Sequence, residues 1–339
     1  KSDSGVLFVK IKDIQDNRLT FDNALFVPQE YYNRLPKNRK AEYGDTLYTV
    51  VGSYGIPAFV NHNIPFCFER NIALLHPNNR VIPKYLYYAV NNPIFYGNAN
   101  NIANGSAQKL IPLSKLAGME ISVPPIERQE TIVNILSAYD DLIENNQKQI
   151  KLLEEAAQRL YKEWFIDLRF PGHENVKIVD GVPEGWERMV LSEVTSILKR
   201  GISPKYSDNG KYSVINQKCI RSSIMDISES RRQEKEYVPT LNLQDSDTVI
   251  CSTGTGTLGR VGRVYGDYPN TTFDSHVTLI RAKENPNYIY HVVKSQQEYL
   301  MGMGRGSTNQ QELYRDVIER LVVLCPSQDI LLKAERVLN

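Results

Sequence analysis

An internal repeat constrains the fold of this 339-residue chain more than any other feature. A glycine before an apolar run, an Asp-Thr pair before a glycine-rich turn, a further apolar run and a Gly-Ser element occur twice in the same order. The paired positions are 201 to 205 residues apart: Gly5 and Gly210, Asp45 and Asp247, Phe68 and Phe273, Tyr85 and Tyr288, Gly105 and Gly306. Short β-branched or aromatic runs alternate with helical segments and turns. The sequence therefore predicts an α/β (mixed α+β) fold with two pseudo-symmetric domains.

A heptad pattern lies between the two copies, after Pro124-Pro125 and before Pro171-Gly172. Its steps alternate between four and three residues, which predicts one helix over residues 127–165, roughly 58 Å long at about 1.5 Å per residue. The seam consists of Ile132, Leu136, Tyr139, Ile143, Asn146, Ile150, Leu153, Ala157, Leu160 and Trp164.

The charge of this helix indicates what it packs against. It carries eight acidic and five basic residues, whereas a helix that lies on phosphates is expected to be basic. Pro326 opens a shorter copy of the pattern, which runs to Asn339. We therefore expect the two helices to form an antiparallel coiled coil, with the polar Asn146 fixing its register.

These patterns divide the chain into four parts. A first domain covers residues 1–124, a spacer helix 125–170, a linker and second domain 171–325, and the start of a second spacer helix 326–339. Copy two has 27 residues from Pro183 up to the residue before Gly210, whereas copy one has four before Gly5. We expect the first domain to lack its start and the second helix to be truncated.

Composition excludes several classes of protein. The net charge is +1, so any DNA-binding surface must come from particular residues and not from bulk charge. The four cysteines and five histidines show no metal-binding spacing, and no disulfide framework is expected. No apolar run approaches the length of a membrane span and the first residues lack a signal-peptide core, so we expect a cytoplasmic protein without membrane contact.

The sequence predicts no cofactor. Residues 254–259 match the G-x-G-x-x-G pattern, but residues 260–266 alternate like a strand, whereas a dinucleotide site needs a helix there. Asn92-Pro93-Ile94-Phe95 lacks the second proline of an amino-methyltransferase motif, and no P-loop occurs. We expect catalysis to belong to partner proteins; a nucleotide-dependent enzyme built on the Gly254 loop is the alternative.

Polar and basic residues lie at matching places in both copies, where amide side chains suit adenine and arginine suits guanine. Asn100, Asn101, Asn104, Ser106, Gln108 and Lys109 correspond to Arg305, Ser307, Thr308, Asn309, Gln310 and Gln311. Further candidates for DNA contacts are Tyr54, Arg70, Asn71, Lys218, Arg221, Thr253, Thr255, Thr257, Arg260, Arg263, Ser275 and His276. The alternative for each is a residue that serves a turn, a phosphate contact or a solvated face.

Nearly the whole chain resembles the specificity subunit of type I restriction-modification systems. The resemblance is carried by the Gly-Ser elements at Gly105 and Gly306, by Pro183-Glu184-Gly185-Trp186-Glu187 with Leu191-Ser192-Glu193-Val194, and by Ile121-Ser122-Val123-Pro124-Pro125-Ile126-Glu127-Arg128-Gln129. The end of copy two, Pro326-Ser327-Gln328-Asp329, is a weak copy of this last segment.

The resemblance implies two target recognition domains that each read one half of a split sequence in double-stranded DNA, held apart by a coiled-coil spacer. It implies a non-catalytic subunit that directs adenine methylation by two methyltransferase subunits and cleavage by motor and restriction subunits. Besides the nucleotide-dependent enzyme, the residues alone leave a second alternative, a coiled-coil adaptor that binds proteins. That adaptor would show no salt-dependent affinity for DNA.

Overall fold

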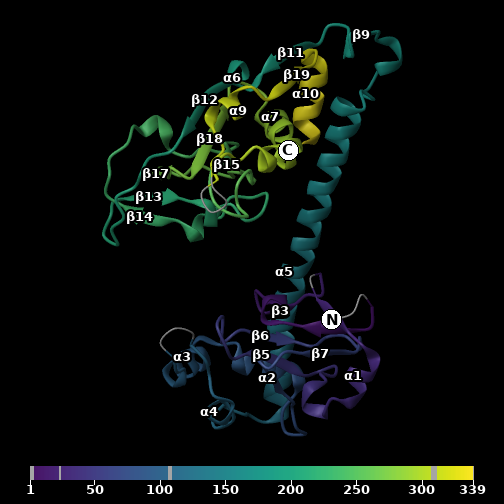
Figure 1. Cartoon of the computed structure of the whole chain (residues 1–339), viewed down its shortest axis with the longest axis vertical. Coiled ribbons are helices and arrows are strands. Elements are labelled where there is room, and N and C mark those ends of the chain that lie inside the picture. The colour runs from purple at the N-terminus through teal and green to yellow at the C-terminus, as the bar shows by residue number, and fades with distance from the viewer. Residues whose placement is uncertain (1–3, 23, 106–108, 307–310, 339) are drawn as a thin grey trace. The chain divides into compact units, whose positions relative to one another are not determined.

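The computed structural model describes residues 4–22, 24–105, 109–306 and 311–338. The chain forms two compact units, which we call unit 1 (Lys1–Gln147) and unit 2 (Lys148–Asn339) (Figure 1). A long helix, α5 (Ile126–Tyr161), has its first part in unit 1 and its last part in unit 2. No helix in the described ranges is both long enough and apolar enough to cross a membrane.

Unit 1 contains two three-stranded sheets. In the first, β1 (Val6–Val9) lies between β4 (Leu25–Val27), which is antiparallel to it, and β7 (Phe66–Phe68), which is parallel. In the second, β5 (Thr46–Thr49) lies between β6 (Pro57–Phe59) and β8 (Ile72–Leu75), both antiparallel to it. The other elements are η1 (Ile11–Asp13), the hairpin of β2 (Ile14–Gln15) and β3 (Arg18–Leu19), α1 (Gln29–Arg34), η2 (Lys37–Arg39), α2 (Pro83–Val90), α3 (Pro93–Ile102) and α4 (Leu113–Ala117).

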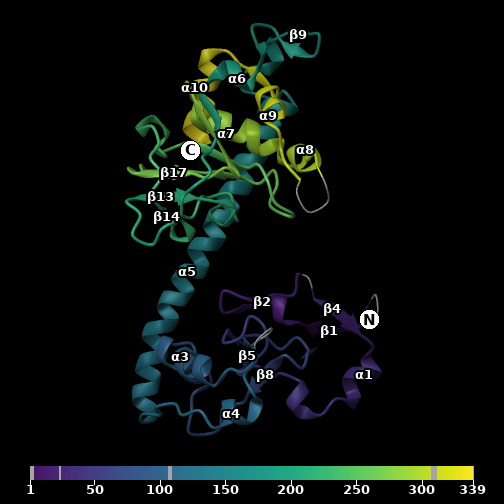
Figure 2. The same cartoon turned by 60° about the vertical axis from the view of Figure 1, so that its left-hand side comes forward.

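Unit 2 repeats this topology. β13 (Tyr212–Ile215) lies between antiparallel β14 (Arg231–Gln233) and parallel β17 (Thr271–Phe273). β15 (Thr248–Cys251) lies between antiparallel β16 (Val261–Arg263) and β18 (Val277–Ala282), and β12 (Thr195–Arg200) extends that sheet beside β18. α7 (Pro286–Ser295), α8 (Gln297–Gly302), α9 (Arg315–Glu319) and α10 (Gln328–Val337) occur in the order of α2, α3, α4 and α5 (Figure 2). The predicted pair of pseudo-symmetric mixed α and β domains is confirmed.

The remaining elements of unit 2 precede or interrupt this repeated set. They are η4 (His173–Asn175), the pair β9 (Ile178–Val179) and β10 (Val182–Pro183), β11 (Glu187–Val190), which pairs with β19 (Val322–Cys325), α6 (Leu191–Val194), η5 (Gln217–Cys219), η6 (Ile227–Glu229) and η7 (Pro239–Leu241). Each unit has its own apolar clusters, which in unit 1 include Leu47 and Phe66 and in unit 2 Val249 and Phe273.

The Asp-Thr pair of the repeat proves to be structural in both units. Asp45 and Asp247 are each 1% exposed. Each carboxylate accepts a 2.8 Å bond from the backbone N–H three residues earlier in the chain. The side chain that contacts the aspartate differs: the Nδ1 atom of His76 is 2.6 Å from Asp45, whereas Arg281 binds both oxygens of Asp247 at 2.7 Å. The repeat therefore preserves a turn closed by a buried aspartate and varies the side chain that pairs with this aspartate.

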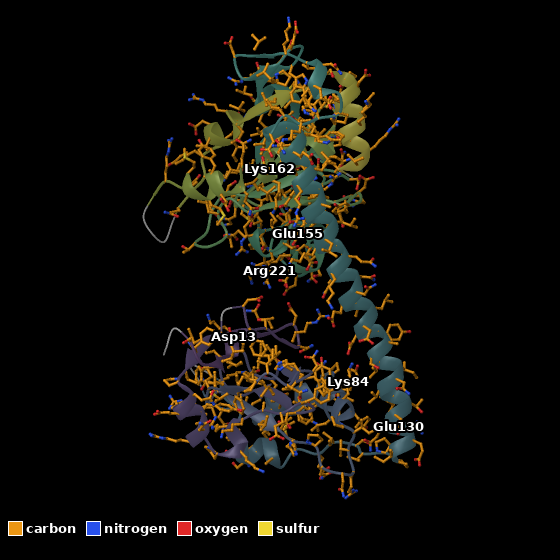
Figure 3. The ribbon with its side chains drawn as sticks, turned by 90° about the vertical axis from the view of Figure 1, so that its right-hand side faces the viewer. Asp13, Lys84, Glu130, Glu155, Lys162 and Arg221 are labelled. Carbon is orange, nitrogen blue, oxygen red and sulfur yellow. The ribbon has the colours of Figure 1, made fainter. Side chains whose placement is uncertain are left out.

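The predicted long helix is confirmed as α5, which ends in a π-helical turn, η3 (Lys162–Ile166). Its first part is anchored in unit 1 by Gln129, whose amide bonds the backbone of Ile82, Arg80 and Pro124 (neighbouring Glu130 is labelled in Figure 3). Its last part enters the core of unit 2 through Tyr161 and Phe165.

The predicted seam describes this helix only in part. Leu136, Tyr139, Ile143, Ile150 and Leu153 are exposed. Ala157, Leu160 and Trp164 pack against the core of unit 2, but the side chains most buried there are Tyr161 and Phe165, which the seam omits. Tyr161 is the last residue of α5, and Phe165 lies within the π-helical turn, where the spacing of side chains departs from the 3.6-residue period. Pairing of the exposed stretch with a second helix stays a prediction.

Candidate nucleic-acid interface

Three loops meet at the end of β5 in unit 1: the glycine turn (residues 51–56), the β7–β8 turn (69–71) and the hairpin that the backbone pairing of Asn104 and Leu110 closes. Hydrogen bonds from backbone N–H groups to backbone carbonyls hold the loops together. They run from Val50 to Asn71 at 2.9 Å, from Ile111 to Val50 at 2.8 Å and from Gly52 to Lys109 at 3.0 Å. We call the outer face of these loops loop surface 1. Five sequence candidates of the first copy therefore lie on these joined loops, although the chain separates them by up to 55 residues: Tyr54, Arg70, Asn71, Asn104 and Lys109.

An aromatic platform covers part of loop surface 1. The phenol of Tyr54 donates to Oδ1 of Asn100 at 2.5 Å. The ring of Tyr54 lies parallel to that of Tyr96, with centroids 6.3 Å apart and an interplanar angle of 11°. Gly55 lies beneath: it has a φ of +87°, and a Cβ there would be 2.6 Å from the Tyr96 ring. The glycine turn thus requires a glycine at this position to support the platform.

The same three loops meet in unit 2. The backbone N–H of Ser252 donates to the carbonyl of His276 at 2.8 Å, as that of Val50 does to Asn71. The backbone N–H of Leu313 donates to the carbonyl of Ser252 at 2.8 Å, as that of Ile111 does to Val50. The hairpin of Arg305 and Glu312 corresponds to that of Asn104 and Leu110, since each pair exchanges two backbone hydrogen bonds. We call this face loop surface 2.

The side chains of loop surface 2 are more polar and more charged. Oγ1 of Thr253 lies 2.5 Å from Nδ1 of His276. Arg200, the last residue of β12, donates through Nε to the carbonyl of Ser275 at 2.5 Å and through Nη1 to Glu312. Arg305 lies over the ring of Tyr314, 5.5 Å from its centroid. Burial raises the pKa of Asp274, which lies beneath this surface and accepts the His276 N–H at 2.8 Å.

The G-x-G-x-x-G segment forms a compact turn. Gly254, Gly256 and Gly259 all have positive φ, and a Cβ on Gly259 would be 2.7 Å from the backbone nitrogen of Met301. Strand β16 begins directly after this turn, at Val261, where a dinucleotide site would have a helix, so the predicted alternation is confirmed. The described residues contain no cluster of three or more His, Cys, Asp or Glu side chains that could hold a metal ion.

Most of the remaining candidates are at the surface, but they do not all belong to the loop surfaces. Exposed or partly exposed are Arg70, Asn101, Lys218, Arg221, Thr255, Thr257, Arg260 and Gln311. Lys218 and Arg221 lie on and after η5, and Arg221 is 4.0 Å from Glu229 (Figure 3). The predicted contacts at Ser106, Gln108, Ser307, Thr308, Asn309 and Gln310 lie outside the described residues.

Burial argues against one candidate, Arg263. It is 3% exposed, donates to Ser246 at 3.2 Å and to Asn287, and its guanidinium lies near the rings of Tyr265 and Tyr290. A side chain held in this way is not available to a phosphate or a base. We therefore leave Arg263 out of the proposed DNA contacts.

Three side chains of these surfaces were not among the sequence candidates: Tyr96, Arg200 and Glu312. Tyr96 precedes Asn100 by four residues and so shares a helix face with it, a signal that the sequence does contain. Arg200 and Glu312 are 112 residues apart in the chain, and no sequence pattern connects them.

Comparison with known proteins is consistent with the two units. A family model described as "Type I restriction modification DNA specificity domain" matches residues 8–155 and again 183–329. The MjaIX specificity subunit of Methanocaldococcus jannaschii is 33% identical over 172 residues, which are 47% of this chain and 40% of that protein. The putative MjaX specificity subunit of the same organism is 29% identical over 62% of this chain and 51% of its own length.

A third relative and a solved structure match almost the whole chain. The HindI specificity subunit of Haemophilus influenzae is 22% identical, over 96% of this chain and 85% of that protein. The crystal structure of a type I restriction-modification S subunit from M. genitalium matches with a TM-score of 0.55 and 17% identity, over 99% of this chain and 81% of that one. The chain spans about half or less of the two M. jannaschii relatives, and the structural match shows a shared fold.

Proposed function

Because the chain belongs to the type I restriction modification DNA specificity domain family, whose model matches it twice, we propose that it is a non-catalytic specificity subunit that reads a split sequence in double-stranded DNA. The observation that carries this proposal is the pair of loop surfaces. Their backbone bonds are equivalent, whereas their side chains differ. A repeated scaffold with different surface residues suits two readers of two different half-sites.

The chemistry of the loop surfaces fits base readout. On loop surface 1, Tyr54, Asn100 and Asn104 offer amides and an aromatic face, and Lys109 offers a cation for phosphates. On loop surface 2, Thr253, His276 and Arg305 offer hydrogen-bond donors suited to purine N7 and O6 acceptors. The remaining exposed candidates, among them Arg70, Asn71, Lys218, Arg221, Thr255, Thr257, Arg260, Ser275 and Gln311, are proposed as neighbouring base or phosphate contacts.

Helix α5 is proposed as the spacer that sets the gap between the half-sites. Its 36 residues span about 54 Å at 1.5 Å per residue, against about 34 Å for one turn of DNA. A stiff link between two modest binding modules raises their joint affinity without new contacts. The exposed apolar residues of α5 are proposed to pack in an antiparallel coiled coil and to dock partner subunits. The proposed division of the chain is the one that the sequence predicts. It consists of a first domain (1–124), a spacer helix (125–170), a linker with a second domain (171–325) and the start of a second spacer helix (326–339).

The proposed partners are those that the family implies. Two methyltransferase subunits would methylate adenine within the target, and motor and restriction subunits would cleave unmodified DNA. The proposed place of action is the cytoplasm, where the DNA substrate is found.

Methylation sequencing of cellular DNA tests the proposal. Cells that carry this chain with its cognate methyltransferase should show methylated adenines in two short half-sites around a fixed gap, and cells that lack the chain should not. An assembled complex that leaves no chain-dependent mark would contradict the proposal and favour a protein-binding adaptor.

A further inference from the structure

Glu312 occupies a backbone position that both units build in the same way. Its backbone N–H donates to the carbonyl of Arg305 at 2.9 Å, and its carbonyl accepts from the N–H of Arg305 at 3.0 Å. It also forms a β-bridge to Thr253. In unit 1, Leu110 bonds Asn104 at 2.8 Å in both directions and bridges Val51. The hairpin of each loop surface is therefore closed by the same backbone contacts.

The side chains at this position differ in kind. Unit 1 has Leu110, which is 40% exposed, and unit 2 has a carboxylate. Because a leucine closes the same hairpin in unit 1, the backbone contacts do not require an acidic side chain. The carboxylate of Glu312 is thus a difference in surface chemistry between two otherwise equivalent loop surfaces.

Arg200 fixes the direction of this carboxylate. Its Nη1 binds Oε1 of Glu312, while its Nε donates to the carbonyl of Ser275 at 2.5 Å. The two side chains are 32% and 37% exposed, so the pair is reachable from solvent. A carboxylate has a second oxygen, and with Oε1 bonded to the guanidinium, Oε2 can accept a bond from a ligand.

The chemistry of a carboxylate restricts what it can meet on DNA. Phosphates repel it, so a carboxylate that contacts DNA is expected to do so at base edges. In the major groove only cytosine N4 and adenine N6 donate, and adenine places the N7 acceptor beside its amino group. Cytosine offers a donor without such an acceptor on the same base.

We propose that Glu312 is a specificity-determining residue that accepts a hydrogen bond from the N4 amino group of a cytosine in the half-site read by unit 2, with Arg200 as its positioning residue. This inference rests on the proposed function. It specifies that one position of the half-site read by unit 2 is a cytosine.

The test is selection from random duplex DNA by the complex of the full chain with its methyltransferase subunits. Wild type, Glu312→Gln and Glu312→Leu, which introduces the residue of unit 1, are compared. Glu319→Gln is the control, because Glu319 is a partly exposed carboxylate of the same unit that also pairs with an arginine, Arg315, at 2.7 Å.

The outcomes separate the proposed role of Glu312 from the proposed function of the chain. We expect the wild type to select a split motif, and both Glu312 variants to lose preference for cytosine at one position by about tenfold or more, while the gap, the other half-site and the control stay unchanged. Unchanged motifs in both Glu312 variants, or loss of all selection in both, would overturn the role of Glu312. Failure of the wild type to select any motif would instead contradict the proposed function.

Discussion

The phenol of Tyr85 donates a 2.8 Å hydrogen bond to the backbone carbonyl of Ser122. Tyr288 makes the equivalent bond to Leu324 in unit 2. Each bond joins the first helix after the second sheet, α2 or α7, to the segment that leads into α5 or α10. The repeat has therefore preserved the contact that holds the segment before α5 or α10 against its own domain.

Removing these phenols should weaken both units. Tyr85 and Tyr288 are 8% and 2% exposed, and Phe in their place removes the donor of a partly buried hydrogen bond. We expect Tyr85→Phe and Tyr288→Phe each to lower the free energy of unfolding by about 1 kcal/mol or somewhat more, measured by urea denaturation. Tyr139→Phe, at a position 63% exposed on α5, is the control and should change little; equal effects in all three would contradict the role assigned to the bonds.

Gly55→Ala should disturb loop surface 1. The added Cβ meets the Tyr96 ring at 2.6 Å in a backbone with φ of +87°, which we expect to cost about 1–3 kcal/mol and to displace the aromatic platform. Methylation sequencing should then show a weakened preference in the half-site read by unit 1 alone. Gly97→Ala on α3 is the matched control, because a Cβ there meets nothing within 4 Å. It should keep the motif and stabilise slightly.

Shortening α5 should shorten the gap in the target. Residues 147–153 are all exposed, and deleting these seven removes about 10 Å of helix, which corresponds to about 3 base pairs of DNA. Methylation sequencing should report both half-sites unchanged around a gap that is shorter by this amount. Deletion of four residues provides a second length, and a gap that stays constant in both variants would exclude α5 as the spacer.

His291 should make unit 2 sensitive to acid. Burial lowers its pKa to about 4, whereas the unfolded chain titrates near 6.5. The unfolded state therefore binds the proton first as pH falls, and the free energy of unfolding should decrease between pH 6.5 and about 4 by up to about 3 kcal/mol. His291→Phe should remove this component, which is read as the difference between the two pH profiles. Profiles that run parallel for the two proteins would contradict this assignment of the acid sensitivity to His291.

The architecture was predictable because the internal repeat presents the same pattern of residues twice in the sequence. The spacing of Asp45 and Asp247 relative to their glycine turns reflects the same turn, closed by a buried aspartate, in both units. The heptad pattern likewise predicted the long helix. It did not predict the burial of Tyr161 and Phe165, because these residues pack in the tertiary core of unit 2 and Phe165 lies in a π-helical turn that interrupts the 3.6-residue period.

The candidate site was less accessible to sequence reasoning. Arg263 was chosen for its charge, but its strand is covered, and Asn287 and two aromatic rings surround its guanidinium. Arg200 and Glu312 meet only because β12 and the hairpin converge in three dimensions. Polar loop composition identified the right region, whereas the individual contacts depend on tertiary packing.

The separate apolar clusters of the two units have a consequence for inheritance. A gene segment that encodes one unit carries its whole core and its whole loop surface, so recombination within the segment for α5 would exchange one half-site while leaving the other domain folded. New targets could then arise in a single event, by combining halves that already work, without passing through a series of destabilised intermediates.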